Sequence, residues 1–361
     1  MYDVRAQLDR LPSSFRAADA LQQGLTYKVL DRLVRHGEIT RVAKGVFCQV
    51  AVAEPVVPRW QRIRDDHLRR ADAALCRHPH HALSHLTGAV ARGWPVELHP
   101  DAAVHLTALH VLPRSRRLDG VVLHHCDSMA NDVETVNGWA ALTPARTVAD
   151  CLRTHRPPVS VAIADGAIRA GSTSIEDVRT VLDLQRGWLG RPQAARTLAL
   201  VDPRRESWLE SFSFVTLHDL GIEMPTPQVE VFDENGRFVA RVDGMWTAAA
   251  TVAEADGHGK YLDVDAGAEG PTGLSAARRV VAERDRERAL VDQGLEVVRW
   301  TRDEIKHRAP DVVRRVELAR SRGDLRRFRG RLRVQGVWIP PRSLPDTPIR
   351  PNQASNWGQT G

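Results

Sequence analysis

The stretch "PTPQVEVFDENGRFVARVDGMWTAAATVAEADG", residues 225–257, decides the fold of the C-terminal part of the chain. Apolar and polar residues alternate on both sides of "DENG", which is a turn sequence typical of a β-hairpin. The run "AAATVAEADG" predicts a third strand, in which Glu254 and Asp256 share one face because alternate residues point the same way. An adjacent strand could bring Asp243 beside Glu254. The stretch therefore predicts a sheet that gathers carboxylates in one place.

The preceding helix, "RRESWLESFSFVTLHDLG", adds Glu206 and Glu210, one turn apart on one face. Neighbouring carboxylates repel, so all of them ionise readily only at a solvated surface or around a cation. Carboxylate oxygens are the ligands that Mg²⁺ or Mn²⁺ takes. One interpretation is ordinary solvent-facing acids at the ends of a sheet. The other is a metal site with Glu210, Asp243 and Glu254 as its ligands.

A metal ion held there could orient and deprotonate a water molecule and stabilise charge on a phosphate oxygen. Lys260, which follows in "EADGHGKY", could stabilise the transition state or position the water. The candidate catalytic residues are then those of the helix, the two strands and the following loop: Glu210, Asp243, Glu254, Asp256 and Lys260.

The N-terminal residues 1–52 predict a winged helix-turn-helix. "SSFRAADALQQG" indicates a helix with a Ser cap that ends at Gly24, and "LTYKVLDRLVRHG" a second helix capped by Thr26. "EITRVAKGVFCQV" then predicts a hairpin, the wing. In this motif the second helix enters the major groove of double-stranded DNA. The alternative is a helical hairpin that binds protein. The candidate DNA contacts on the second helix and the wing are Tyr27, Lys28, Arg32, Arg35, Arg41 and Lys44.

Residues 59–200 alternate helical patterns with short strands and predict a mixed α/β middle domain. "HPHHALSH" clusters His78, His80, His81 and His85, but no carboxylate or Cys lies at a ligand spacing, so capping, packing and surface roles are favoured over metal binding. In "TPARTVADCLR", Asp150 interrupts an apolar face, and Arg146 is the expected partner. The four cysteines form no C-x-x-C pair and indicate neither a zinc site nor a disulfide framework.

The length and charge of the chain limit the number of domains, the location of the protein and the kind of partner it could bind. A chain of 361 residues suits two or three domains. There is neither an apolar run long enough to span a membrane nor a signal-peptide pattern, so a cytoplasmic protein is expected. Residues 306–333 carry eleven Lys or Arg against three acids, whereas the whole chain has a net charge of +6. This basic segment could neutralise phosphates or could be a solvated helix. Residues 337–361 are rich in Pro, Asn and Gln and predict a disordered tail.

These patterns resemble known families. Residues 203 to about 305, and above all "EADGHGKY", resemble the very-short-patch-repair-like branch of the PD-(D/E)xK nucleases, which implies a domain over 203–335 with a restriction-endonuclease-like fold around a mixed sheet. "FRAADALQQGLTYKVLDRLVRHGEITRVAKGVF" is similar to the winged helix of AbiEi-type antitoxins of type IV toxin–antitoxin systems, and "LTPARTVADCLR" to their remainder. The overall expectation is an α/β (α+β) protein.

The resemblance implies that Glu210 is the acid of the helix, Asp243 the central metal ligand and Glu254 the second metal ligand. It also implies that Arg286 and Glu287 lie on the following helix and Arg299 after the last strand. The chain departs from the family where Asp256 occupies the place of the usual lysine, so either Lys260 has taken that role or cleavage is weak or lost. Two functions follow: a Mg²⁺- or Mn²⁺-dependent DNA endonuclease, or a non-enzymatic DNA-binding regulator of the antitoxin type. Duplex DNA is the expected partner of both, with a cognate toxin and a homodimer as further candidates.

Overall fold

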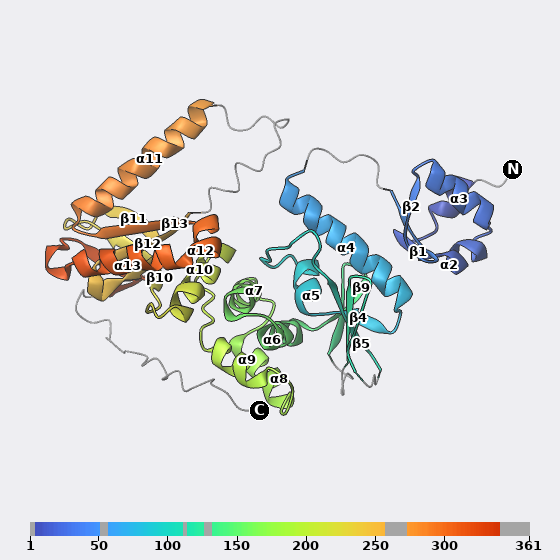
Figure 1. Cartoon of the computed structure of the whole chain (residues 1–361). Helices are drawn as coiled ribbons and strands as arrows, with labels where there is room; N and C mark the ends of the chain where they lie inside the picture. Colours follow the sequence, from blue (N-terminus) through green and yellow to red (C-terminus); the bar gives the residue numbers. More distant parts are fainter. Residues whose placement is uncertain (1–3, 51–56, 111–113, 126–131, 257–272, 340–361) are drawn as a thin grey trace. The chain divides into compact units, whose positions relative to one another are not determined.

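The computed structural model describes residues 4–50, 57–110, 114–125, 132–256 and 273–339 (Figure 1). The chain forms two compact units. Among the described residues, the first comprises those up to Arg156 together with Gly166–Val201, and the second comprises Pro157–Asp165 and those from Asp202 onward. Both units combine helices with β-sheets, which confirms the α/β (α+β) class. The N-terminal and middle domains expected at 1–52 and 59–200 both lie in the first unit, although the first turns of a helix within the latter belong to the second.

The N-terminal elements occur in the order α1 (Val4–Leu8), β1 (Ser14–Arg16), α2 (Ala17–Gln22), α3 (Tyr27–Arg35), β2 (Ile39–Ala43) and β3 (Val46–Gln49). The predicted second helix and wing are present as α3, β2 and β3, and Thr26 Oγ1 caps α3 by accepting from Val29 N at 3.3 Å. The predicted Ser cap on the first helix is wrong. Ser14 begins a strand that pairs with β3, because the buried Phe15 stacks on Phe47 in the domain core.

The middle region is built on one six-stranded sheet. Its strands run in the order β6-β7-β5-β4-β9-β8, where β5 and β7 are parallel and β4 and β5 antiparallel. α4 and α5 pack on β5. The elements are α4 (Arg59–Arg77), β4 (His81–Leu83), α5 (His85–Ala91), β5 (Val104–Ala108), β6 (Arg116–Leu118), β7 (Val121–His124), β8 (Val133–Val136), β9 (Trp139–Leu142), α6 (Pro144–Thr154), α7 (Pro157–Arg169), α8 (Ile175–Leu184) and α9 (Arg191–Leu198).

The second unit contains another six-stranded sheet in the order β13-β12-β11-β10-β14-β15. β12 and β13 are parallel and the other pairs antiparallel, so the expected mixed sheet is confirmed. The elements are α10 (Trp208–Asp219), β10 (Thr226–Phe232), β11 (Phe238–Trp246), β12 (Thr251–Asp256), α11 (Gly273–Asp292), β13 (Glu296–Thr301), α12 (Arg302–His307), α13 (Ala309–Arg322), β14 (Arg331–Val334) and β15 (Val337–Ile339).

One boundary of this unit differs from the prediction. Residues 337–339, expected to begin a disordered tail, form β15 because Val337 pairs with Val334 across a tight turn. The rest of that predicted tail, 340–361, lies outside the described residues.

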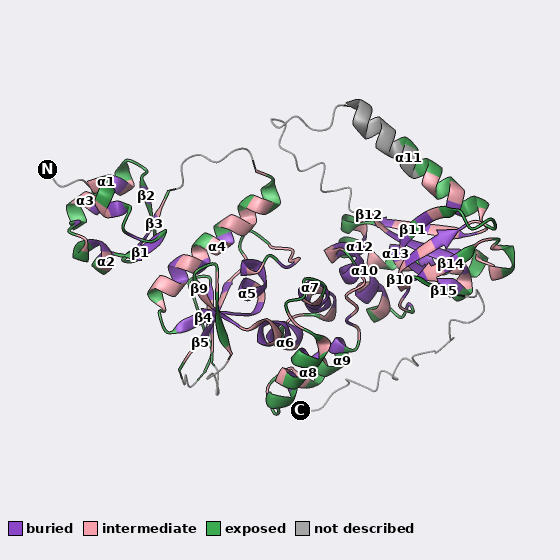
Figure 2. Cartoon of the chain, turned by 180° about the vertical axis from the view of Figure 1, so that it is seen from behind, coloured by how far each residue is buried: buried purple, intermediate pink, exposed green. Residues whose placement is uncertain are grey.

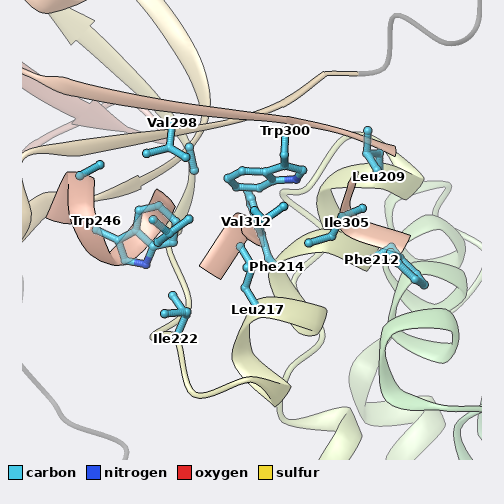
Figure 3. Packing of buried hydrophobic residues seen from close by; sticks show 13 residues of the cluster. Leu209, Phe212, Phe214, Leu217, Ile222, Trp246, Val298, Trp300, Ile305 and Val312 are labelled. Carbon is cyan, nitrogen blue, oxygen red and sulfur yellow. The ribbon is translucent and has the colours of Figure 1, made fainter. Parts of the chain in front are cut away.

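Helices cover both faces of this sheet (Figure 1). One apolar cluster joins β12 and β13 to α10, α12 and α13, and in it Trp300 and Phe214 meet edge to face with centroids 6.2 Å apart (Figure 3). A second cluster joins the other face to α11 through Val252 and Leu290. The central strands are accordingly buried (Figure 2). In the part of the chain that the structure describes, no helix is long and apolar enough to cross a membrane.

Candidate functional site

The acids of β11 and β12 come together as the alternation predicted. Gly244 pairs with Ala253 in the antiparallel ladder, which puts Asp243 opposite Glu254. The backbone N–H of Ala255 donates to Asp243 Oδ2 at 2.8 Å and holds the carboxylate against β12. Glu254 is buried and Asp243 half-buried, so these are not solvent-facing acids at the end of a sheet.

Glu210 reaches this group from the first turn of α10. Ser207 caps the helix by accepting from Glu210 N at 3.1 Å, and the Glu210 side chain is itself buried. Its Oε2 accepts from Glu206 N at 2.9 Å and from Gln228 Nε2 at 2.8 Å. The expectation that Glu206 shares the helix face is wrong. The cap at Ser207 excludes Glu206 from the helix, and its exposed side chain pairs with Arg241 at 2.7 Å.

Gln228 is a member of the site that the sequence did not reveal. It lies on β10 between Pro227, which pairs with Gly244, and Val229, which pairs with Val242, and so stands across from Asp243. Its φ of +56° is in the left-handed region, which is strained for any residue other than glycine. Backbone strain of this kind is characteristic of functional sites. In the sequence, the local signal for an unusual backbone at Gln228 was the pair of prolines in "PTPQ", residues 225–228.

The site carries more negative charge than its surroundings neutralise. Burial first, and then the charges of Glu254 and Glu210, raise the pKa of Asp243 to about 7, against the opposing influence of the Ala255 N–H and of Arg286. Arg286, on α11, lies with Nη2 2.6 Å from Glu254 Oε1 and 3.2 Å from the Arg241 carbonyl oxygen. The three carboxylates are therefore electrostatically coupled, and one of them is already paired with a guanidinium.

The remaining predicted residues are placed less centrally. Asp256 ends β12 and is half-buried, whereas Lys260 lies outside the described residues. Arg299 lies within β13 rather than after it, and its Nη2 is 3.6 Å from Glu287 Oε2. Within the described segments the oxygens of Glu210, Asp243 and Glu254 do not form a set with all members within 4.8 Å of one another, whereas three histidines elsewhere do. The carboxylates would have to draw closer to share one ion.

Those histidines, His85, His105 and His124, form a second cluster in the first unit. Their rings stack, with centroids 3.7 Å apart for His85 and His124 and 5.2 Å for His105 and His124. Burial and the neighbouring imidazoles keep the rings neutral: the pKa of His105 falls to about 3, that of His124 to about 4, and that of His85 well below its usual value. The clustering of His85 with His78, His80 and His81 in the sequence did not reveal this triad, because two of its members come from distant strands.

The candidate DNA-binding residues of α3 and the wing are all solvent-exposed, as predicted. Leu30 and Leu33 occupy the opposite, buried face of α3. One of the wing cations is partly neutralised, since Arg41 Nη2 lies 3.1 Å from Asp31 Oδ1. The exposed residues of α3 and the wing thus comprise cations and one aromatic ring, Tyr27.

The buried acid of α6 has the partner expected of it, and a second one. Arg146 Nε donates to Asp150 Oδ2 at 2.9 Å, and Arg153 Nη2 donates to Oδ1 at 2.6 Å. Both guanidinium groups lie over the Trp188 ring. Asp150 and Arg153 of this network lie close enough to His124 to influence its charge.

The chain is similar to proteins of Mycobacterium tuberculosis that are described only as uncharacterized. In each of two strains, the relative is 28% identical over 234 residues, which is 64% of this chain and 78% of the relative. No protein-family model matches the chain.

Proposed function

We propose that this chain is a DNA-binding protein whose second unit is a metal-dependent endonuclease that hydrolyses DNA phosphodiesters. The observation that supports the proposal most strongly is the buried convergence of Glu210, Asp243 and Glu254 from a helix and two adjacent strands. Such a group of carboxylates is unfavourable without compensation, as the raised pKa of Asp243 indicates.

A divalent cation fits this donor set. Asp243 and Glu254 are hard oxygen ligands, and Glu210 Oε2 is oriented by Gln228. Mg²⁺ or Mn²⁺ held there would supply an activated water and charge stabilisation at the scissile phosphate. Arg286, whose side chain is 40% exposed, can contact a phosphate oxygen directly if it leaves Glu254. Asp256 remains a candidate catalytic residue at the open end of β12.

The N-terminal elements supply the proposed contact with DNA. In a helix-turn-helix the second helix enters the major groove, and the exposed Lys28, Arg32 and Arg35 of α3 are suited to phosphate and base contacts there. Arg41 and Lys44 extend the cationic surface along the wing. Double-stranded DNA is the partner this surface fits, and a cytoplasmic location belongs to the same proposal.

A second function, a non-enzymatic DNA-binding regulator of the antitoxin type, is favoured by one observation. The Arg286 guanidinium already pairs with Glu254 at 2.6 Å and so takes the place of a cation. In that protein the carboxylates and Arg286 stabilise the fold, and a cognate toxin or a second copy of the chain would be its protein partner.

A plasmid-nicking assay distinguishes the two functions. The full chain is incubated with supercoiled DNA and Mg²⁺ or Mn²⁺, alongside Asp243→Ala and Glu254→Ala and the control Glu234→Ala, an exposed acid at the hairpin tip. The endonuclease proposal expects nicking by wild type and Glu234→Ala only. Wild type that is inert with both ions but still retards duplex DNA in a gel supports the regulator. Loss of retardation in Arg32→Ala/Arg35→Ala tests the DNA-binding surface itself.

A further inference from the structure

We propose that His85, His105 and His124 form a binding site for a zinc-class transition-metal ion, separate from the carboxylate site. One ligand nitrogen from each of these residues lies within 4.8 Å of the other two. His85 begins α5, while His105 and His124 lie on the parallel strands β5 and β7. The site would therefore join the start of α5 to two strands of the sheet.

The ring nitrogens lie close enough together for one ion, but the His85 and His124 rings stack with their planes 17° apart, so the rings would have to turn for their lone pairs to meet there. His105 Nδ1 lies 2.9 Å from His124 Nε2, so one imidazole donates its N–H to the other. A metal ion could take the place of that proton between the two nitrogens. Two nitrogens of a tetrahedral zinc site lie about 3.3 Å apart, given Zn–N bonds of about 2.0 Å. The two rings would have to separate slightly and turn to admit the ion.

His85 provides an independent observation. It is buried, and among the described residues its Nε2 has no hydrogen-bond partner. Its Nδ1 lies 3.0 Å from Ser84 Oγ. When Nδ1 carries the proton and donates to that hydroxyl, Nε2 keeps a lone pair that can bind an ion, and outer hydrogen bonds of this kind fix the tautomer of metal-bound histidines. A buried imidazole nitrogen without a partner otherwise loses the hydrogen bond it made to water.

The backbone around the site is constrained to hold this geometry. His85 has φ +49°, a strained value for a residue other than glycine. Ser84 N donates to the His105 carbonyl oxygen at 3.1 Å, which ties the start of α5 to β5. Thr87 Oγ1 accepts from His105 N at 2.8 Å and also contacts His67 Nε2 at 2.9 Å. Two of the three ligands are therefore fixed relative to each other by the backbone.

The donor set selects the class of ion. Three neutral imidazoles without a carboxylate suit Zn²⁺, Co²⁺, Ni²⁺ or Cu²⁺ and do not suit Mg²⁺ or Ca²⁺. Asp150 favours positive charge at His124, whereas Arg153, His155 and His125 oppose it. Three protein ligands also leave the fourth tetrahedral position for water or a small ligand.

Co²⁺ titration of the full chain tests the proposal, after removal of any affinity tag and of bound metal with a chelator. With excess Mg²⁺ present to occupy the carboxylate site, wild type is expected to bind one Co²⁺ with visible d–d absorption, which Zn²⁺ abolishes. His105→Gln and His124→Gln are expected to weaken binding by more than about tenfold, and Ser84→Ala by about ten- to a hundredfold. His99→Gln, which removes an exposed histidine outside the cluster, should bind as wild type does.

Two results would overturn the site: no stoichiometric binding of Co²⁺ or Zn²⁺ by wild type, or unchanged binding by His124→Gln. Should the glutamine variants fail to fold, the decision rests on wild type and Ser84→Ala, since the latter keeps all three rings. Glu254→Ala should retain Co²⁺ binding at the histidines. The histidine site and the endonuclease proposal are therefore tested independently, and failure of either one does not contradict the other.

Discussion

Arg286 Nη2 lies 2.6 Å from Glu254 Oε1, and this contact joins α11 to the acidic site on the sheet. The pair is asymmetric: the Glu254 side chain is 9% exposed and that of Arg286 is 40% exposed. Removing the arginine therefore leaves a buried carboxylate without its cation, while removing the glutamate leaves an arginine that water can solvate.

Arg286→Gln should lower the free energy of unfolding by about 1–2 kcal/mol in the absence of divalent ions, because the buried Glu254 loses its partner. Mg²⁺ or Mn²⁺ should restore more stability to this variant than it adds to wild type. Urea unfolding with and without the ion measures both effects. Equal responses of the two proteins would show that the ion does not bind beside Glu254.

Asp243 should make stability depend on pH. Its pKa is about 7 in the folded protein and about 3.9 in an unfolded chain, so the folded state retains a proton that the unfolded state releases. The contribution is fully present below about pH 4 and is lost as the pH rises through about 7. Asp243→Asn should remove this dependence and be the more stable protein near pH 8, by on the order of 2–4 kcal/mol.

Chemical unfolding of both proteins at about pH 4, 6 and 8, without divalent ions, checks this sign. A variant that loses stability relative to wild type as the pH rises would contradict it. Glu234→Gln, at the exposed tip of the hairpin turn, is the matched control and should leave the pH dependence unchanged.

Alanine substitutions at Gly294 and Gly236 distinguish the stability cost of backbone strain from that of steric overlap. Both have positive φ, +88° and +79°. A Cβ on Gly294 would lie 2.3 Å from the Arg327 carbonyl oxygen, whereas a Cβ on Gly236 would meet nothing within 4 Å. Gly236→Ala should therefore cost about 1 kcal/mol of stability and Gly294→Ala about 3 kcal/mol or more. Similar losses in thermal or urea unfolding would mean that the segment after α11 moves away at little cost.

Trp300 tests the core of the second unit. It is fully buried, and within the described chain its Nε1 has no hydrogen-bond partner. Trp300→Phe loses volume but also removes an unsatisfied donor, so it should cost only about 1–2 kcal/mol. Trp300→Ala leaves a cavity beside Phe214 and should cost about 3–5 kcal/mol. Equal losses for the two variants would show that the indole N–H is satisfied in solution.

The predictions that the structure confirms rested on interactions between residues close together in the sequence or on adjacent strands. Thr26 caps α3 and Gly294 follows α11 because side-chain caps and left-handed glycines act on the nearest turn of a helix. Strand alternation placed Asp243 beside Glu254, since a hairpin and the strand that follows it are neighbours in space as well as in sequence. The helical repeat likewise related Arg146 to Asp150.

What the sequence by itself determined is thus the type of many elements though not of β1 and β15, some of the ends, and contacts within a few residues or across adjacent strands. Only the tertiary structure decided that Gln228 lies across from Asp243, that Arg286 pairs with Glu254, and that His85, His105 and His124 meet. The physical reason is that periodicity and capping are short-range. Which strands neighbour one another across long connections is settled by the burial of whole apolar faces, and no local pattern records that choice.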